Sequence, residues 1–308
     1  MRAAFARTLA EIGERDRRVV LLTGDLGFMA LEPFSGRLPD RFLNVGVAEQ
    51  NMVGLATGLA EAGFVPFLYS IATFASLRPY EFIRNGPVHQ QLPVRVVGVG
   101  GGFEYGTAGP THHGLEDVAV MRVQPGLTVV TPADHEQARS ALLATWDLPG
   151  PVYYRLGKDD RAVVPGLGGH FELGRLSLLR EGDDLLFVSM GAITTEVAAA
   201  AESLSGDGIA AAVAVVSCLN PDPVEDLAAL LYRFRVAIAV EAHYASGGLG
   251  SALAELIADR GIGCRLVRRG VRRLSDGRSG SQAYLQRLHG LDRASLARTA
   301  LEAMAARC

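Results

Sequence analysis

The stretch RFLNVGVAEQNMVGLATGLAEAG (41–63) decides the fold, because it leads from an apolar strand directly into a helix of mostly small residues. Glu49 lies in the first turn of this expected helix, where the helix dipole favours a negative charge. Gly46, Gly54 and Gly58 are expected to let neighbouring backbone approach closely. We therefore expect the Glu49 carboxylate to point into a tightly packed apolar corner of the molecule.

Strand-like apolar segments alternate with helical periods on both sides of this stretch. The expected helices lie at 3–13, 48–62, 78–85, 115–122, 134–146, 192–204, 223–233, 248–260 and 292–306. The expected strands lie at 19–24, 42–45, 64–70, 94–100, 127–131, 152–155, 185–190, 209–217, 236–241 and 264–267. This alternation predicts parallel sheets covered by helices, so the expected fold class is α/β.

The alternation is interrupted between 158 and 183, where glycines, a proline and charged residues replace the regular pattern. We interpret this segment as a linker that carries the first edge elements of a second domain. The chain is therefore expected to contain one domain at 1–157, the linker at 158–183 and a second domain at 184–308. Each domain should hold a largely parallel sheet flanked by helices.

Composition excludes several classes of partner. The chain has 308 residues and a formal net charge of −3, which gives no electrostatic reason to expect nucleic acid or an anionic membrane. No apolar run approaches the ~20 residues of a membrane span, and residues 1–16 read as an amphipathic helix and not as a signal peptide. Cys218, Cys264 and Cys308 lack metal-ligand spacing, so we expect reduced thiols in a cytoplasmic protein.

Lys158 is the only lysine in the chain, and Asp159 and Asp160 follow it directly. These neighbours should keep the ammonium group charged, whereas a lysine that attacks a carbonyl needs a lowered pKa. We therefore exclude Schiff-base aldolases and pyridoxal enzymes.

Several polar and aromatic residues remain open to two interpretations. The glycines in 98–102 and 247–251 follow strands, but they match no nucleotide-binding motif and are better explained as turns. His112 and His113 have no partner for a zinc site. They belong either to a helix-capping loop or to a ligand-binding loop at the end of a parallel strand. Phe74 belongs either to a helix core or to a flat wall for a ring-shaped ligand.

Seven segments, taken in order, carry a resemblance to a known family. They are TGDLG (23–27), RFLNVGVAEQNMVGLATGLA (41–60), TF…RPYEFIR (73–84), GPTHHGLED (109–117), LTVVTPAD (127–134), VYYRLG (152–157) and VEAHYASGGLGS (240–251). Over nearly its whole length the chain resembles the transketolase and deoxyxylulose-phosphate synthase group. The resemblance implies a pyrimidine-binding domain, a transketolase C-terminal-like domain and thiamine diphosphate as the cofactor.

The resemblance also implies roles for single residues around the cofactor. Glu49 is implied to hydrogen-bond N1′ of the aminopyrimidine, which favours the tautomer that generates the reactive ylid. A carboxyl group in an apolar cleft holds a proton more readily, and the electron sink belongs to the cofactor. Phe74, or alternatively Leu77, is implied to stack on the ring, with Tyr80 nearby. The TGDLG motif places Asp25 and Leu26 on the same cofactor-binding side.

The substrate side of the implied site combines matches with departures. His112 matches a histidine that contacts the substrate and assists catalysis, and Arg2 and Arg155 match arginines that hold a sugar phosphate. A planar guanidinium suits such an anion.

Three positions depart from the family pattern. They are Ala108 in place of an acid, Gly100 in place of a phosphate-contacting histidine and Met29 in place of a serine. We therefore expect an altered sugar pocket.

Members of the family also need a diphosphate-binding domain, which is marked by GDG followed at a set distance by Asn. The GDG at 206–208 lacks that Asn. The chain is thus expected to be one half of a split transketolase, with a separate subunit holding the diphosphate and Mg²⁺ in an α2β2 assembly. No metal site is expected in the chain itself. It would help to transfer a two-carbon ketol unit from a ketose to an aldehyde.

Three alternatives remain. The chain could be the β subunit of a 2-oxo acid dehydrogenase, part of a deoxyxylulose-phosphate-synthase-like ligase, or a non-catalytic scaffolding subunit.

Overall fold

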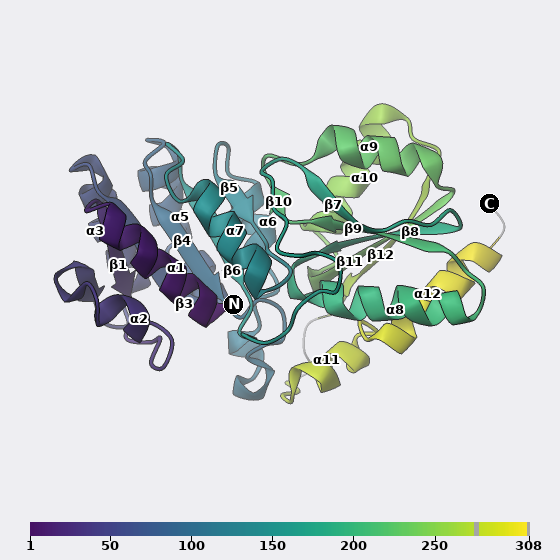
Figure 1. Ribbon diagram of the computed structural model, residues 1–308, viewed down its shortest axis with the longest axis horizontal. Helices are drawn as coiled ribbons and strands as arrows, with labels where there is room; N and C mark the ends of the chain where they lie inside the picture. Colours follow the sequence, from purple (N-terminus) through teal and green to yellow (C-terminus); the bar gives the residue numbers. More distant parts are fainter. Residues whose placement is uncertain (274–276, 307–308) are drawn as a thin grey trace.

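Seven strands form the first sheet of the computed structural model, which describes residues 1–273 and 277–306 (Figure 1). They are β1 (Val19–Thr23), β2 (Phe42–Asn44), β3 (Val65–Ile71), β4 (Arg95–Val99), β5 (Thr128–Val130), β6 (Val152–Leu156) and β10 (Cys218–Leu219). Their order is β10-β5-β6-β4-β3-β1-β2, and all neighbours are parallel except β10 and β5. The strands β1, β4 and β6 are buried along their whole length, which explains their continuous apolar sequences.

Helices cover both faces of this sheet. They are α1 (Arg2–Arg15), α2 (Glu32–Ser35), α3 (Glu49–Glu61), α4 (Ala72–Leu77), α5 (Tyr80–Ile83), α6 (Asp117–Arg122) and α7 (His135–Thr145). Successive side chains of a strand point to opposite faces. In β1, Val19 and Leu21 accordingly join the core cluster of α1 and α7, whereas Val20 and Leu22 join the cluster that contains α3.

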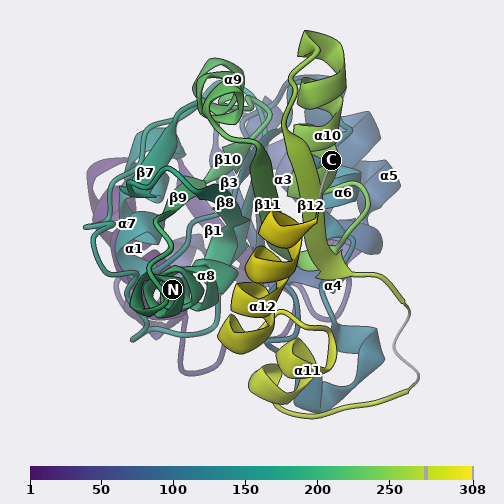
Figure 2. The same ribbon diagram turned by 90° about the vertical axis from the view of Figure 1, so that its right-hand side faces the viewer.

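The second sheet has five strands in the order β12-β11-β8-β9-β7. They are β7 (Leu176–Arg180), β8 (Leu185–Met190), β9 (Ala211–Val216), β11 (Val236–Tyr244) and β12 (Arg265–Val271). Only β7 runs antiparallel to its neighbour. The covering helices are α8 (Thr194–Gly206), α9 (Val224–Arg233), α10 (Leu249–Arg260), α11 (Gln282–Leu288) and α12 (Arg293–Ala305). Helices α8 and α12 lie on one face, and α9 and α10 lie on the other (Figures 1 and 2).

The two domains are joined by more than the linker. After β9 the chain crosses to the first sheet, where β10 pairs Cys218 with Val130 at the edge of β5. The Asn220 side chain then donates hydrogen bonds to the carbonyl oxygens of Gln124 (3.0 Å) and Leu127 (2.7 Å). The second domain therefore supplies an edge strand to the first sheet, which a division at 184 did not anticipate.

The predicted α/β class with two largely parallel, helix-flanked sheets is confirmed. The predicted C-terminal helix is α12, and β7 is an edge element within 158–183. The predicted helix at 78–85 is wrong in its bounds, because the chain forms α4, α5 and a π-helical turn (Arg84–Val88). Pro79 and Pro87 lack the N–H that a regular helix needs, which fits this break. No helix in the described part of the chain is long and apolar enough to cross a membrane.

Candidate active site

Glu49 is the first residue of α3, and its side chain is only 2% exposed. Ser70, near the end of β3, donates a hydrogen bond from Oγ to Glu49 Oε1 at 3.1 Å. Arg78 donates from Nη1 to Glu49 Oε2 at 2.9 Å. Gly24, just after β1, adjoins the same carboxylate, since a Cβ there would be in ordinary van der Waals contact with Oε1 at 3.7 Å. Three neighbouring segments thus fix a buried carboxylate at the carboxyl edge of the sheet.

The expected close packing around Gly46, Gly54 and Gly58 is wrong for this chain by itself. A Cβ added to Gly46, Gly54 or Gly58 would meet no atom within 4 Å. Val47, just before α3, and Leu55, within it, are also exposed. The reason is that only one face of α3 packs against its own domain, and the adjacent edge strand β2 is short and partly exposed. Glu49 therefore lies at the border between a packed face and an open apolar face.

Phe74, His112 and Arg78 form a contiguous group next to Glu49. The Phe74 ring packs edge-on against the His112 ring, with 5.0 Å between the centroids. The Arg78 guanidinium lies 4.1 Å from the Phe74 centroid while it also binds Glu49. Arg78 was missed by sequence reasoning, because nothing in the linear motif shows that it reaches an acid 29 residues away.

The two adjacent histidines point in different directions. His112 faces Phe74, and its Nδ1 lies 3.0 Å from Thr111 Oγ1. His113 packs edge-on against Phe103 instead, and burial lowers the pKa of its imidazole. Only His112 therefore belongs to the group around Phe74.

Asp25 and Leu26 lie in the loop after β1, and Asn44 ties this loop to the turn before Glu49. Asn44 donates from Nδ2 to Asp25 Oδ1 at 2.9 Å, and its Oδ1 accepts from the backbone N–H of Gly46 at 3.0 Å. Asp25 is exposed and Leu26 is half-buried. Sequence reasoning missed Asn44, although its place at the end of β2 could have indicated a loop-bridging role.

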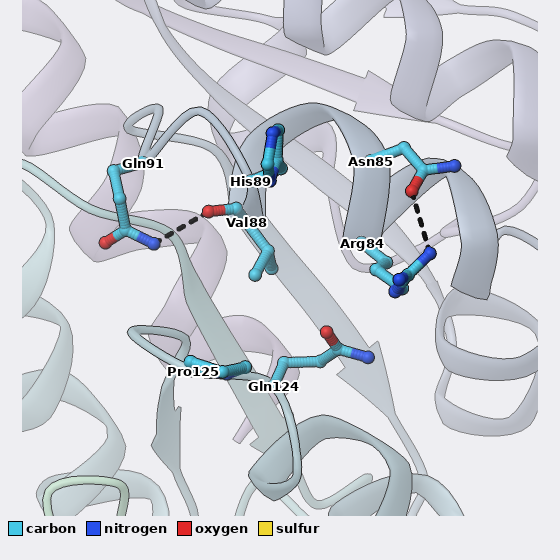
Figure 3. A pocket seen from close by; sticks show the side chains of 7 residues that line it. All are labelled: Arg84, Asn85, Val88, His89, Gln91, Gln124 and Pro125. Atoms are coloured by element: carbon cyan, nitrogen blue, oxygen red, sulfur yellow. Dashed lines mark hydrogen bonds between the residues drawn. The ribbon is translucent and has the colours of Figure 1, made fainter.

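Tyr80 does not join the Phe74 group through any contact in the described part of the chain. Its hydroxyl accepts a hydrogen bond from Gln124 Nε2. Gln124 lines a different pocket of about 660 Å³ (Figure 3), which the π-helical turn closes on the opposite side. In the figure Gln124 and Pro125 face Val88 and His89 across this pocket. Leu77, the alternative to Phe74, is exposed at the end of α4.

Arg155 lies in a sealed ion pair and not at an open surface. Its Nε donates to Asp117 Oδ2 at 2.8 Å, and its Nη2 donates to the carbonyl oxygens of Gly114 (2.8 Å) and Ala242 (2.9 Å). Tyr153 also donates its hydroxyl proton to Asp117, at 2.7 Å. These contacts hold Arg155 at the junction of the two domains, and its contact with a sugar phosphate stays a prediction.

Arg2 and the three departures from the expected pattern lie at the same edge of the sheet. The Nε atom of Arg2 is buried without a hydrogen-bond partner. Gly100 has a positive φ of 77°, and a Cβ there would overlap the Tyr105 ring. Tyr105 thus takes the room that a larger residue at position 100 would need. Ala108 and Met29 are exposed.

The strand order brings these groups to one edge. The strands β1, β3, β4 and β6 are consecutive parallel neighbours, so their carboxyl ends lie side by side. Asp25, Phe74, His112 and Arg155 follow or end these strands, and Glu49 follows β2 beside them. Ligands of open parallel sheets bind at such an edge. Among residues 1–273 and 277–306, no three His, Cys, Asp or Glu side chains gather as a metal site.

Comparisons with known proteins agree with this geometry. Residues 1–161 match the transketolase pyrimidine binding domain, and residues 174–296 match the transketolase C-terminal domain. A putative transketolase C-terminal section of Methanocaldococcus jannaschii is 35% identical over 99% of this chain and 96% of that protein. A 6-deoxy-6-sulfo-D-fructose transketolase subunit of a Clostridium species is 37% identical over 98% of this chain and 94% of its own length.

A solved structure extends the likeness to the whole fold. It is described as a split gene transketolase in an inactive beta4 tetramer, and it superposes with a TM-score of 0.87 at 32% identity. The alignment covers 98% of this chain and 96% of that one. The chain therefore belongs to the transketolase family, whose pyrimidine-binding and C-terminal domains it contains.

Proposed function

We propose that this chain is the pyrimidine-binding subunit of a split, thiamine diphosphate-dependent transketolase. With its partner it transfers a two-carbon ketol unit from a ketose to an aldehyde. The observation that carries the proposal is the buried Glu49 carboxylate, which lies beside Phe74 and His112 at the edge of the sheet. A scaffolding subunit would have no use for this group.

The residues present fit the aminopyrimidine of thiamine diphosphate. Glu49 would hold the ring nitrogen N1′, because its carboxylate is fixed by Ser70 and by the start of α3. Phe74, or Leu77 in its place, would form the flat wall, and Asp25 and Leu26 would border the ring. When bound, the cofactor supplies a thiazolium carbanion that serves as nucleophile and electron sink. Tyr80 lies further away and would act only through α5.

Arg78 must move or make room if the aminopyrimidine ring is to reach Glu49. It contacts both Glu49 and Phe74, so it borders the space where a ring would meet the carboxylate. Its side chain is 44% exposed and can turn toward solvent. We infer that Arg78 holds the Glu49 carboxylate in one orientation before the cofactor enters.

A second subunit would complete the site. The open face of α3 and its surroundings carry exposed apolar side chains, and permanent interfaces are built from such surfaces. These side chains are Phe28, Leu43, Val47, Leu55 and Phe82. We propose that a diphosphate-binding subunit covers this region and holds Mg²⁺, giving an α2β2 assembly. Cys218 and Cys264 are free and buried, in keeping with a reducing cytoplasm.

The substrates would be sugars with a charged end. His112 would contact the substrate near its carbonyl group, since it lies against Phe74 and keeps a half-buried ring. Arg2 would hold the remote anion, because its buried Nε lacks a partner within the described chain. Arg155 would act indirectly, by fixing the Gly114 loop that follows His112.

The decisive experiment compares two variants of α3 in the reconstituted pair. Glu49→Gln should abolish most turnover and slow proton exchange at C2 of bound thiamine diphosphate, whereas Glu61→Gln at the exposed end of the same helix should do neither. Both variants should fold and assemble normally. Exchange at the wild-type rate in Glu49→Gln would show that Glu49 is only a helix-end acid. Reduction of lipoyl groups by the wild-type pair would favour the 2-oxo acid dehydrogenase alternative.

A titration tests the split arrangement. The purified chain should bind thiamine diphosphate and Mg²⁺ poorly, and addition of the partner subunit should restore both tight binding and turnover. Calorimetry with the chain alone and with the pair measures this directly. Tight binding and turnover by the chain alone would overturn the need for a partner.

A further inference from the structure

The segment between β4 and α6 forms a loop whose two ends are tied together. The N–H of Gly102 donates to the Gly114 carbonyl oxygen at 2.7 Å, and the N–H of Gly114 donates back to the Gly102 carbonyl oxygen at 3.0 Å. The residues between them, 103–113, form two short 3₁₀ turns, Gly106–Ala108 and Pro110–His112. Because such turns hold few hydrogen bonds of their own, the contacts that the loop makes with its surroundings decide its shape.

The second domain holds this loop in place. The N–H of Gly280 donates to the Gly106 carbonyl oxygen at 3.1 Å. The approach is so close that a Cβ at Gly106 would overlap Gly280 and, in α11, Leu285. Phe103 is 1% exposed and belongs to a core cluster that the second domain largely forms. The loop that carries His112 is therefore fixed to the other domain.

His113 connects His112 to this contact with the second domain. Its ring packs edge-on against Phe103, with 5.1 Å between the centroids, and Phe103 stacks on His289, just after α11, also at 5.1 Å. The His112 ring instead meets Phe74 of the first domain at 5.0 Å. The two adjacent side chains thus reach opposite sides of the loop, so a fixed His113 ring also fixes the backbone that carries His112.

The surroundings of His113 suit an uncharged ring. The residue is 4% exposed. Both ring nitrogens are buried, and neither lies at hydrogen-bond distance from a partner in the described part of the chain, although such groups normally have one. A buried group without a partner costs far more free energy as a cation than as a neutral ring. Burial accordingly lowers the pKa of the His113 imidazole.

The neighbours of His113 give a proton little support. Two imidazoles, His112 and His289, oppose a positive charge on its ring, and only the nearby Gly106 backbone favours one. The other titratable groups of the loop, the start of α6 and the segment around α11 form no hydrogen bond with the ring. They are Glu104, Tyr105, Glu116, Asp117, Arg278, Tyr284 and Arg287. A charged His113 would therefore be repelled by two neighbours and bonded to no carboxylate within residues 1–273 and 277–306.

We propose that His113 is a positioning residue, whose uncharged ring on Phe103 holds His112 in place and whose protonation releases the loop. The role of His112 toward the substrate rests on the proposed function, but the coupling between the two histidines stands on the local geometry. Because the folded chain disfavours the proton, protonation in turn favours forms in which the ring reaches water. The second domain thus makes the substrate side of the site dependent on pH, with the ordered loop present above the pKa of His113.

The coupling can be measured on the full chain without its partner. Carbon-13 labelling of the imidazoles gives NMR signals for the seven histidines, which His112→Gln and His113→Phe assign. On acidification from pH 8 to pH 5, His113 should titrate below about 6.5, the usual value of an imidazole. The His112 signal should show a further step at that pH besides its own titration, and His113→Phe should remove this step. A His113 signal that titrates at about 6.5, or a His112 signal that His113→Phe leaves unchanged, would overturn the proposal.

A kinetic test uses the reconstituted pair. His113→Ala should lower kcat at least tenfold at pH 8, while the affinity for thiamine diphosphate and proton exchange at its C2 change less than twofold. His113→Phe keeps a ring against Phe103 and should restore at least half of the wild-type kcat. The ratio of kcat in His113→Phe to kcat in the wild type should rise at least threefold from pH 8 to pH 5.5, because only the wild type can take up the proton.

His170→Gln is the matched control, because His170 is an exposed histidine outside the loop, and it should keep the wild-type kcat and pH profile. If circular dichroism shows that His113→Phe does not fold, the smaller His113→Leu replaces it in both tests. A constant ratio of the two kcat values across the pH range would overturn the release by protonation, and an unchanged kcat in His113→Ala would overturn the positioning role. If the pair had no transketolase activity, the proposed function would fail, and the histidine signals would still decide the coupling.

Discussion

Two acid–arginine pairs of the first domain have nearly the same length and very different surroundings. Glu49 and Arg78 meet at 2.9 Å, with side-chain exposures of 2% and 44%. Asp117 and Arg155 meet at 2.8 Å, with exposures of 0% and 5%. In the first pair the exposed Arg78 side chain can turn away, which frees the Glu49 carboxylate to bind a ligand. In the second pair neither partner can move without unpacking the junction between the domains.

The surroundings also decide how each carboxyl group behaves. Burial disfavours the charge of Asp117, but Arg155, His243 and the hydrogen bond from Tyr153 together outweigh this effect and hold the pKa of Asp117 below its usual value. Glu104 is half-buried, no arginine in the described part of the chain forms an ion pair with it, and burial raises the pKa of its carboxyl group to about 7. The comparison teaches that an acid whose cation is buried beside it stabilises the fold. An acid without a buried cation can change its partner or its protonation state.

The largest expected effect comes from breaking the sealed pair. Asp117→Ala leaves the Arg155 charge buried without a partner, which should lower the free energy of unfolding by about 3–5 kcal/mol. Urea unfolding of the purified chain measures this. The double variant Asp117→Ala/Arg155→Met should recover part of the loss, because it removes the unpaired charge. If Asp117→Ala unfolds like the wild type, the pair is not structural.

Substitution of Glu49, in the half-exposed pair with Arg78, should change activity and not stability. Glu49→Gln should lower turnover of the reconstituted pair at least a hundredfold, equivalent to about 2.7 kcal/mol of activation free energy. Its free energy of unfolding should change by less than about 1 kcal/mol, since the amide can still accept from Ser70 and Arg78. A large stability loss with retained turnover would place Glu49 in the same class as Asp117.

The pH dependence of the unfolding free energy tests whether Glu104 differs from Asp117 in the folded chain. Because the pKa of Glu104 is raised from 4.5 to about 7 in the folded chain, the folded state binds a proton that the unfolded state has lost. The Glu104 contribution to stability should therefore fall as pH rises from about 4.5 to about 7, by on the order of 3 kcal/mol. Glu104→Gln should remove this slope in urea unfolding measured at pH 5, 6, 7 and 8. An unchanged slope in the variant would assign the titration to another group.

The smallest expected effect is the interaction free energy between Glu49 and Arg78. Arg78→Gln should destabilise the chain by about 1 kcal/mol or less, because half-exposed ion pairs contribute little. A double-mutant cycle with Glu49→Gln should give a coupling below about 1 kcal/mol, against more than about 2 kcal/mol for Asp117 with Arg155. Comparable couplings in the two pairs would contradict the distinction drawn from their exposures.

The sequence by itself determined the architecture and the place of Glu49 at the start of a helix. The alternation of apolar strands with helical periods requires parallel sheets covered by helices, because each apolar face must be buried. A strand that runs straight into the start of a helix places Glu49 at the carboxyl edge, where the dipole favours its charge. The order of motifs likewise placed Phe74 and His112 in the same region, and their rings are in contact.

Only the tertiary structure decided which cation accompanies which acid and which faces stay open. Arg78 lies 29 residues from Glu49, and Arg155 lies 38 residues from Asp117, so no local pattern records either pair. The same holds for Tyr105 in the space beside Gly100, for β10 on the first sheet and for the uncovered glycines of α3. A periodic pattern specifies that a face is apolar, but side chains from distant segments decide what finally covers it, since packing and ion pairing depend on distances in space.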